Sequence, residues 1–167
     1  FYKVEIASAQ ASAVGTLSNP INTDVNTING VSKAGAGDIY LNERNSVTLA
    51  SLLNQDGLIN VISGGTMNAA SVVTTGSAPS SISLKTTAGD IEVGTVNAAS
   101  GAADVTLTSA ASITDNDANS LVSANNFNFT AGNVVGNTVP RSISIVGGHV
   151  VLNIQNQANA AGYNIYF

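Results

Sequence analysis

The only histidine of the chain, His149, is the first residue to test for chemistry. A Ser–His or Cys–His catalytic pair needs an imidazole that is oriented by a carboxylate and faces a nucleophile. His149 follows two glycines and precedes Val150, as expected of a corner that leads into a strand. A zinc site would need further His or Cys ligands, and the chain has none. We interpret His149 as an exposed turn residue and predict no catalytic residue.

Oxygen-bearing side chains alternate at Asp115, Asp117 and Asn119. This is the pattern of the first half of an EF-hand calcium loop, which also requires Gly at its sixth position and Glu at its twelfth. Ser120 and Asn126 occupy those two positions here. We therefore interpret the segment as an Asp/Asn-rich corner. Its three alternating residues remain a candidate calcium site, and no other cofactor is predicted.

The ten acidic residues raise the question of a polysaccharide lyase or glycosidase. A glycosidase needs two carboxyl groups at a set separation across a sugar, and the sequence does not place any two acids in that way. Asp38, Asp90 and Asp104 each precede an apolar segment, so we interpret them as residues of turns or strand starts. Glu92 lies within a strand-like segment and is expected to point outward. We predict that the chain is not an enzyme, and keep a carbohydrate-binding or carbohydrate-active protein as the alternative.

The elements that position these residues are short apolar-polar-apolar strands, which recur every 16 to 23 residues. The copies begin at Val4, Ile21, Ile39, Ile59, Ile82, Val105, Phe127, Ile143 and Ile165. A period of about 20 residues built from strands is typical of a solenoid, in which each coil buries its apolar face by stacking on the next. Alternation along each strand sends the central residue outward, as at Tyr40, Asn60 and Thr106. We predict an all-β parallel β-helix of about eight coils with about 20 residues per coil.

Second apolar patches follow the strands, for example Val47-Thr48-Leu49 and Val150-Val151-Leu152. Gly, Asn, Asp and Ser separate the patches, so each coil is expected to hold two or three strands joined by polar corners. A β-sandwich is the alternative, because its strands also recur every 8–12 residues. It would require two-residue hairpin turns between long matched strands. Asn29-Gly30 and Asp56-Gly57 lack such flanks, and we interpret them as corners.

Composition and charge exclude several classes of partner. The 167 residues carry a net charge of -5, and the five basic residues are scattered. Nucleic acid is therefore not expected as a partner, because binding to phosphates needs several basic residues on one face. No apolar run approaches the roughly 20 residues of a membrane span, so we expect no membrane insertion. Because the chain contains no Cys, it has no disulfide framework.

The four tyrosines, Tyr2, Tyr40, Tyr163 and Tyr166, are concentrated toward the ends of the chain. Aromatic side chains stack on sugars and anchor interfaces. They also cover the open ends of a β-helix or simply continue a strand pattern. The sequence leaves these interpretations open.

In addition to the strand period of about 20 residues, the sequence shows a longer repeat. Residues 14–21 resemble residues 135–143, and the two valines that begin these stretches are 121 residues apart. We predict that residues 1–167 form a single β-helix segment of a longer repeat array, either cut from a larger protein or left as its mature product. Gly15 and Gly136 are expected to need positive φ at corners.

Two stretches carry a family resemblance, VGTLSNPINTDVNTINGVSKAGAGDIYLNERNSVTL at 14–49 and DVTLTSAASITDNDANSLVSANNFNFTAGNVVG at 104–136. A G-T-x-x-N-P turn, a G-D-I-x-L strand start and an S-I-T-D-x-x-x-x-x-L corner resemble the repeats of filamentous-haemagglutinin-like surface adhesins. The resemblance covers nearly all of the chain and is more specific for architecture than for activity. The amino-terminal secretion domain of that family is not in this sequence.

The resemblance implies a right-handed parallel β-helix that is exported across a Gram-negative outer membrane. It also implies an extracellular stalk or fibre at the cell surface that serves attachment. Because terminal coils are unpaired strand edges, we expect end-to-end self-association into filaments. Glycans or proteins of a host or neighbouring cell surface are the other expected partners.

Overall fold

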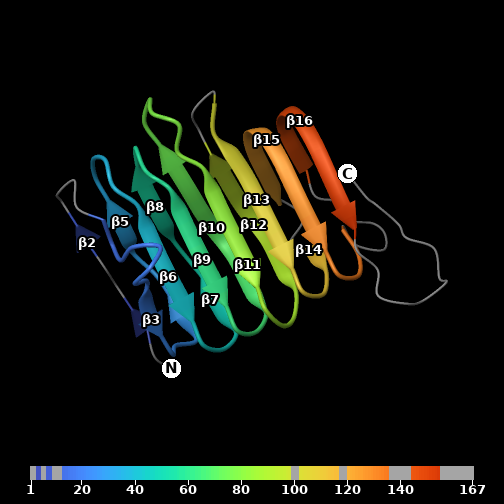
Figure 1. Cartoon of the computed structure of the whole chain (residues 1–167), viewed down its shortest axis with the longest axis horizontal. Helices are drawn as coiled ribbons and strands as arrows, with labels where there is room; N and C mark the ends of the chain where they lie inside the picture. The colour runs from blue at the N-terminus through green and yellow to red at the C-terminus, as the bar shows by residue number, and fades with distance from the viewer. Residues whose placement is uncertain are drawn as a thin grey trace.

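The described part of the chain is built of strands. The computed structural model describes residues 3–4, 7–8, 13–98, 102–116, 120–135 and 144–154. These residues contain no helix, and hence none that is long and apolar enough to cross a bilayer. Parallel pairings join their sixteen strands into one sheet. The coils follow one another along the long axis of the molecule, from the N-terminal to the C-terminal end (Figure 1).

Each coil contributes strands to three stacked series, which we call faces A, B and C. Face A consists of β3 (Ile21–Thr23), β6 (Ile39–Glu43), β9 (Ile59–Ser63), β11 (Ile82–Thr86), β13 (Asp104–Ser109) and the second parts of β15 (Leu121–Ala131) and β16 (Ser144–Ile154). Face B consists of β1 (Lys3–Val4), β4 (Thr27–Ile28), β7 (Val47–Leu49), the first parts of β10 (Met67–Thr75) and β12 (Ile91–Ala98), and β14 (Ile113–Asp115). Face C consists of β2 (Ala7–Ser8), β5 (Val31–Lys33), β8 (Leu52–Gln55), the second parts of β10 and β12, and the first parts of β15 and β16.

Face A has the register that the sequence predicts from Ile39 to Phe127. The next member of the series is Val150, which the sequence analysis assigned to a second patch. The residues that pair one after another in adjacent coils are Ile39, Ile59, Ile82, Val105, Phe127 and Val150. The successive steps are 20, 23, 23, 22 and 23 residues, which gives about five turns. The predicted parallel β-helix is confirmed, with slightly longer coils than expected.

The predicted number of about eight coils is wrong. Val4 lies on face B and Ile145 on face C, while Ile21 pairs with Leu41, two residues beyond the expected partner. Buried and more exposed side chains alternate on every face because one side of each strand is packed inside. Short patterns that resemble one another therefore occur on different faces, and the sequence count combined copies from all three. The copy at Ile165 lies outside the described residues.

Apolar side chains fill the interior of the coils. On face A the inward residues Ile39, Val61 and Leu84 are fully buried. Toward the C-terminal end the aromatic rings of Phe127 and Phe129 take the place of aliphatic side chains. The two rings meet edge to face, with centroids 6.1 Å apart and planes at 63°. Each coil thus depends on its neighbours for most of its apolar burial.

A column of inward polar side chains lines the corner between faces A and B. Its members are Thr23, Glu43, Ser63, Thr86 and Ser109. The hydroxyl of Ser63 donates to the carbonyl of Asn45 at 2.6 Å, and that of Thr86 donates to the carbonyl of Gly89 at 2.9 Å. Since backbone groups at a corner lack strand partners, the hydroxyls of Ser63 and Thr86 satisfy them instead.

Three aspartates lie at strand starts, as the sequence predicts, and in the structure each of them also bonds to the next coil. Asp38 accepts the N–H of Leu58 at 2.9 Å, and Asp90 accepts the N–H of Ser112 at 2.8 Å. Asp104 accepts the side-chain amide of the asparagine one coil further on at 2.7 Å. The three carboxylates therefore hold successive coils together at the starts of strands.

The corners predicted at Gly15, Asn29-Gly30 and Asp56-Gly57 are confirmed. The φ angles of Gly15 and Gly30 are 72° and 70°, values that favour glycine because it lacks a Cβ. Asp56 has a φ of 53°, and its Oδ1 accepts the N–H of Ser77 at 2.9 Å. The second predicted glycine corner, Gly136, lies outside the described residues.

The long repeat stays a prediction. Val14 pairs with Ile39 on face A, whereas Val135 pairs with Ile113 on face B. Residues 136–143 of the second copy lie outside the described residues. The described strands nevertheless all belong to one sheet.

Candidate functional site

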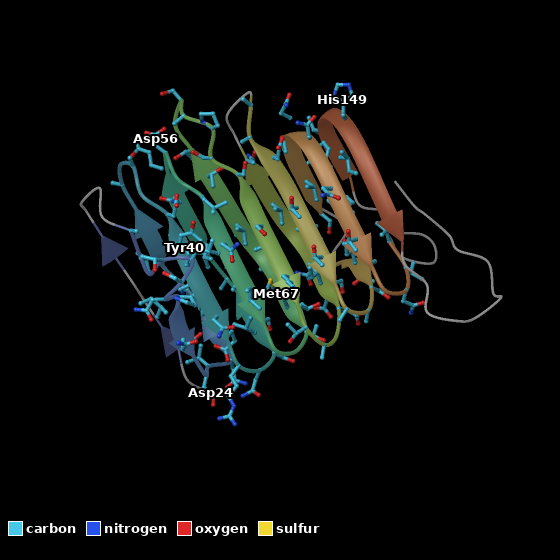
Figure 2. The ribbon with its side chains drawn as sticks, in the orientation of Figure 1. Asp24, Tyr40, Asp56, Met67 and His149 are labelled. Atoms are coloured by element: carbon cyan, nitrogen blue, oxygen red, sulfur yellow. The ribbon has the colours of Figure 1, made fainter. Side chains whose placement is uncertain are left out.

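His149 is exposed, as predicted, and lies in strand β16 (Figure 2). It pairs in register with Asn126, two residues after the point where Gly147 pairs with Ala124. The φ of Gly147 is 154°, and the strand passes from face C to face A here. His149 therefore lies beyond a bend within a continuous strand, where the sequence predicted a turn.

The candidate calcium segment is only partly described. The side chain of Asp115 faces the coil interior in register with Val93, is 7% exposed and accepts the hydroxyl of Ser120. The same hydroxyl lies 2.6 Å from the carbonyl oxygen of Val93. Asp117 and Asn119 lie outside the described residues. Within the described ranges, no three His, Cys, Asp or Glu residues group closely enough to hold a metal ion.

Glu43 is a carboxylate inside the coil that the sequence reasoning missed as a site of interest. It is 1% exposed, and both of its oxygens accept the N–H of Val25, at 3.2 and 3.1 Å. Its Oε1 also accepts the N–H of Asn45 at 3.1 Å. The signal was present in the alternation of β6, which puts Ile39, Leu41 and Glu43 on the same inward side.

The outer surface of face A carries a row of uncharged polar side chains. Tyr40, Asn60, Ser83, Thr106 and Asn128 pair one after another along the axis. Each of them alternates with buried neighbours, so their predicted outward direction is confirmed. The row offers amide and hydroxyl groups and one aromatic ring to solvent.

Tyr40 is held in place by the aspartate two residues before it. Its hydroxyl donates to Oδ2 of Asp38 at 3.1 Å, while Oδ1 of Asp38 accepts the backbone of the next coil. Partial burial raises the pKa of the Tyr40 hydroxyl above its usual value, and the hydrogen bond to Asp38 and its negative charge raise it further. The phenol therefore remains a neutral hydrogen-bond donor at physiological pH.

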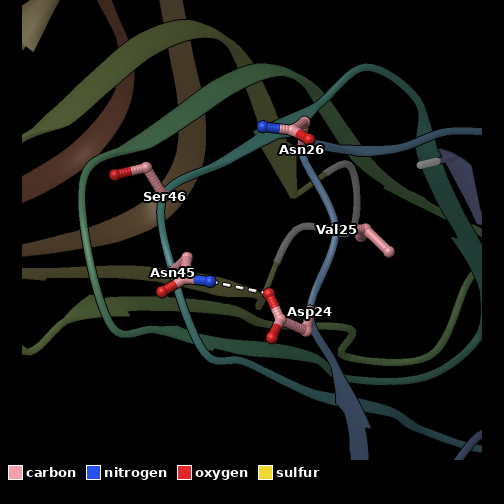
Figure 3. Close-up of a pocket in the computed structure, with 5 residues that line it drawn as sticks. All are labelled: Asp24, Val25, Asn26, Asn45 and Ser46. Atoms are coloured by element: carbon pink, nitrogen blue, oxygen red, sulfur yellow. Dashed lines mark hydrogen bonds between the residues drawn. The ribbon is translucent and has the colours of Figure 1, made fainter. Parts of the chain in front are cut away.

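A charged cluster lies where face A turns into face B near the N-terminal end. Oδ1 of Asp24 accepts the side-chain amide of Asn45 at 2.6 Å, and its Oδ2 lies 3.6 Å from Nη1 of Arg44. Both charged side chains are largely exposed, at 58% and 80%. Figure 3 shows Asp24 and Asn45 at the edge of an open depression of about 430 Å³, which Val25, Asn26 and Ser46 also line.

A second depression lies on the other side of Asp24. It measures about 400 Å³ and is lined by Asn22, Thr23, Asp24, Asn42 and Arg44. The side-chain amide of Asn42 donates to Oδ1 of Asn22 at 2.8 Å, which joins two adjacent coils. This depression therefore continues the polar surface of face A toward the corner.

A short hairpin interrupts face A at its N-terminal edge. Thr16 and Asn19 exchange backbone hydrogen bonds at 3.0 and 3.1 Å and form an antiparallel bridge. Leu17, in the loop between them, is 76% exposed. The sequence signalled a turn here through the G-T-x-x-N-P pattern, but it gave no sign that the turn splits an edge strand.

Face B carries a further open depression of about 370 Å³. Its lining consists mainly of hydroxyl and amide side chains, and includes Glu92 and Asn68. Glu92 points outward, as predicted, and pairs with Asn68 on one side and Thr114 on the other. Asn68 exchanges side-chain hydrogen bonds with Asn116, at 3.4 and 3.0 Å.

A comparison of the chain with family models, curated proteins and solved structures found no match in any of the three. The β-solenoid fold and the side chains that its faces present are therefore the features that indicate a function.

Proposed function

We propose that this chain is a structural segment of a stalk or fibre at the surface of a Gram-negative bacterium, and that it contributes to attachment. The observation that carries the proposal is the stacking of five coils in one parallel register. Such a register allows a rod to be extended coil by coil, because each added coil makes the same kind of contacts as the one before it. We assign no reaction and no resident cofactor to the segment.

The coil geometry suits a load-bearing role. Backbone hydrogen bonds between neighbouring coils run along the axis of the rod, so that a pull along the axis is shared among the three faces. Buried apolar side chains on every face oppose separation of the coils. The row on face A is uncharged, which agrees with a surface kept soluble by amides and hydroxyls.

Two strand edges support end-to-end assembly. Among the described strands, β3 pairs only with β6 at one end of face A, and β16 pairs only with β15 at the other. Because every strand pairing is parallel, the last coil of one copy has the strand direction needed to pair with the first coil of another. A head-to-tail contact of this kind does not close on itself, and it generates filaments.

A charge placed at the C-terminal edge tests this assembly. Val146 is 58% exposed on β16, and Asn97 occupies the same outward row two coils further inside. The Val146→Lys variant is expected to abolish concentration-dependent association, because an edge lysine disfavours strand addition. The matched Asn97→Lys variant is expected to associate like the parent. Light scattering and sedimentation velocity across a concentration series give the measurement.

Two results would reject end-to-end assembly: a parent chain that stays monomeric at every concentration, or equal association of the two lysine variants. The display part of the proposal has its own test. Antibodies against this segment are expected to label intact cells of the source bacterium, and labelling only after lysis would reject surface display.

A further inference from the structure

Among the Phe, Tyr and Trp side chains of the described residues, only that of Tyr40 is presented to solvent. Phe127 and Phe129 are fully buried. The hydroxyl of Tyr40 donates to Asp38, which fixes the ring on the outer surface of face A. Figure 2 shows Tyr40 on the broad face of the sheet, toward its N-terminal end. A ring held in this way loses little conformational freedom when a ligand stacks on it.

Amide side chains surround this ring. Asn60 pairs with Tyr40 on the next coil, and Asn42 follows two residues later on the same side of β6. Asn42 is itself held by its hydrogen bond to Asn22. Adjacent coils lie about 4.8 Å apart, so amides from neighbouring coils are close enough to bond to different polar groups of one small ligand.

The hairpin at residues 16–19 adds a raised edge beside this surface. The N–H of Tyr40 donates to the carbonyl of Val14 at 2.8 Å, so the segment leading into the hairpin packs directly against β6. A Cβ at Gly15 would lie 2.7 Å from the carbonyl oxygen of Tyr40, which shows how closely the two segments approach. The depression lined by Asn22, Asn42 and Arg44 continues the same surface toward the corner.

We propose that Tyr40, Asn60, Asn42 and Asn22, with the adjacent depression, bind an uncharged hexopyranose unit of a glycan chain. The ring supplies a stacking face for the apolar side of the sugar. The amides supply paired donors and acceptors for neighbouring sugar hydroxyls. The cation of this surface, Arg44, already faces the carboxylate of Asp24, so it does not favour a sulfated or uronic sugar. The site rests on its own geometry and does not depend on filament formation.

The test is a titration of the whole chain with hexasaccharides, followed by NMR. Neutral probes are maltohexaose, cellohexaose, mannohexaose and chitohexaose, and a heparin-derived hexasaccharide is the anionic probe. A single open site predicts a Kd on the order of 1 mM for at least one neutral probe. Tyr40→Ala is expected to weaken that binding about tenfold or more, through loss of the stacking face.

Two further variants separate the sugar site from general effects. Tyr40→Phe keeps the ring and is expected to bind within about threefold of the parent. Thr106→Ala, in the same outward row two coils beyond Asn60, is expected to bind as the parent does. Melting curves of all three variants should match that of the parent, because each change lies on the surface.

Three results would overturn the proposal: no shift with any neutral probe at about 10 mM, stronger binding of the heparin fragment, or equal losses in Tyr40→Ala and Thr106→Ala. Shifts at these residues that depend on protein concentration and not on sugar would assign the surface to a second copy of the chain, and would also overturn it. None of these results bears on the lysine variants that test assembly, so the two proposals fail separately.

Discussion

At the scale of single residues, the polar side chains that matter most for the fold are those turned inward. Glu43 carries a carboxylate among hydroxyl-bearing neighbours in the corner column, where it accepts backbone N–H groups from two adjacent coils. A buried acceptor that is removed leaves its donors unsatisfied, which costs more than an exposed hydrogen bond contributes. Glu43 thus joins two adjacent N-terminal coils through hydrogen bonds to its buried carboxylate.

Glu43→Gln is therefore expected to lower the free energy of unfolding by about 1–3 kcal/mol. The amide retains one acceptor oxygen but turns an NH₂ group toward the N–H of Val25. Glu92→Gln is the matched control, since Glu92 is only half-buried on face B, and it should change stability by less than about 0.5 kcal/mol. Urea unfolding followed by circular dichroism gives both values. Equal effects in the two variants would show that Glu43 has no special role.

At the scale of elements, the corners decide how closely the coils stack. The turn from Ser63 to Met67 spans fewer residues than the equivalent turn from Thr86 to Ile91. A short turn leaves no space between coils. A Cβ at Gly64 would lie 1.8 Å from the carbonyl oxygen of Arg44. Glycine at this corner is therefore required by backbone proximity.

Gly64→Ala is expected to destabilise the protein by about 1–3 kcal/mol, because the neighbouring backbone must move to make room. Thr87→Ala is the matched control. Thr87 follows the corresponding strand one coil later and is exposed. The substitution removes one long hydrogen bond, from its hydroxyl to the carbonyl of Ser63 at 3.4 Å, so its effect should stay within about 0.5 kcal/mol. Thermal unfolding of both variants supplies the comparison. If the Gly64→Ala protein is as stable as the parent, the backbone at this corner can move to accommodate a Cβ without loss of stability.

At the scale of the whole molecule, stability is a property of the stack. Each interior coil has two neighbours, while a terminal coil has one. The contribution of an apolar side chain to the free energy of unfolding therefore depends on its position along the axis. Ile82 is 1% exposed between Ile59 and Val105, whereas Ile21 on the terminal strand of face A is 40% exposed.

Ile82→Ala is accordingly expected to lower the free energy of unfolding by about 2–5 kcal/mol, as replacement of other buried large side chains by alanine does. Ile21→Ala should cost less than about 1 kcal/mol, because its side chain has less contact to lose. Denaturant unfolding with a shared slope for the two variants measures the difference. Similar losses of unfolding free energy in the two variants would argue against the idea that interior coils contribute more to stability than terminal ones.

The class of fold and the direction of many side chains follow from the amino-acid sequence. The inward positions of Ile39 and Ile82 and the outward position of Tyr40 follow from alternation along a strand, which is a local property of an extended backbone. The position of Asp38 and Asp90 at strand starts was also predictable, because aspartate is common where a turn leads into a strand. Their bonds to Leu58 and Ser112 join different coils, and the sequence did not predict them.

Two features depend on how the coils pack in space: the face that each strand occupies, and the residues from distant coils that come into contact. A position around the coil depends on the summed lengths of all preceding corners, so a single longer corner, such as the one before Ile91, shifts every later pattern to a new place. Contacts such as that between Asn68 and Asn116, which are 48 residues apart, arise only after the coils stack. Alternation along a strand shows which of its sides is buried. Which other strands it contacts depends on how the coils pack against one another.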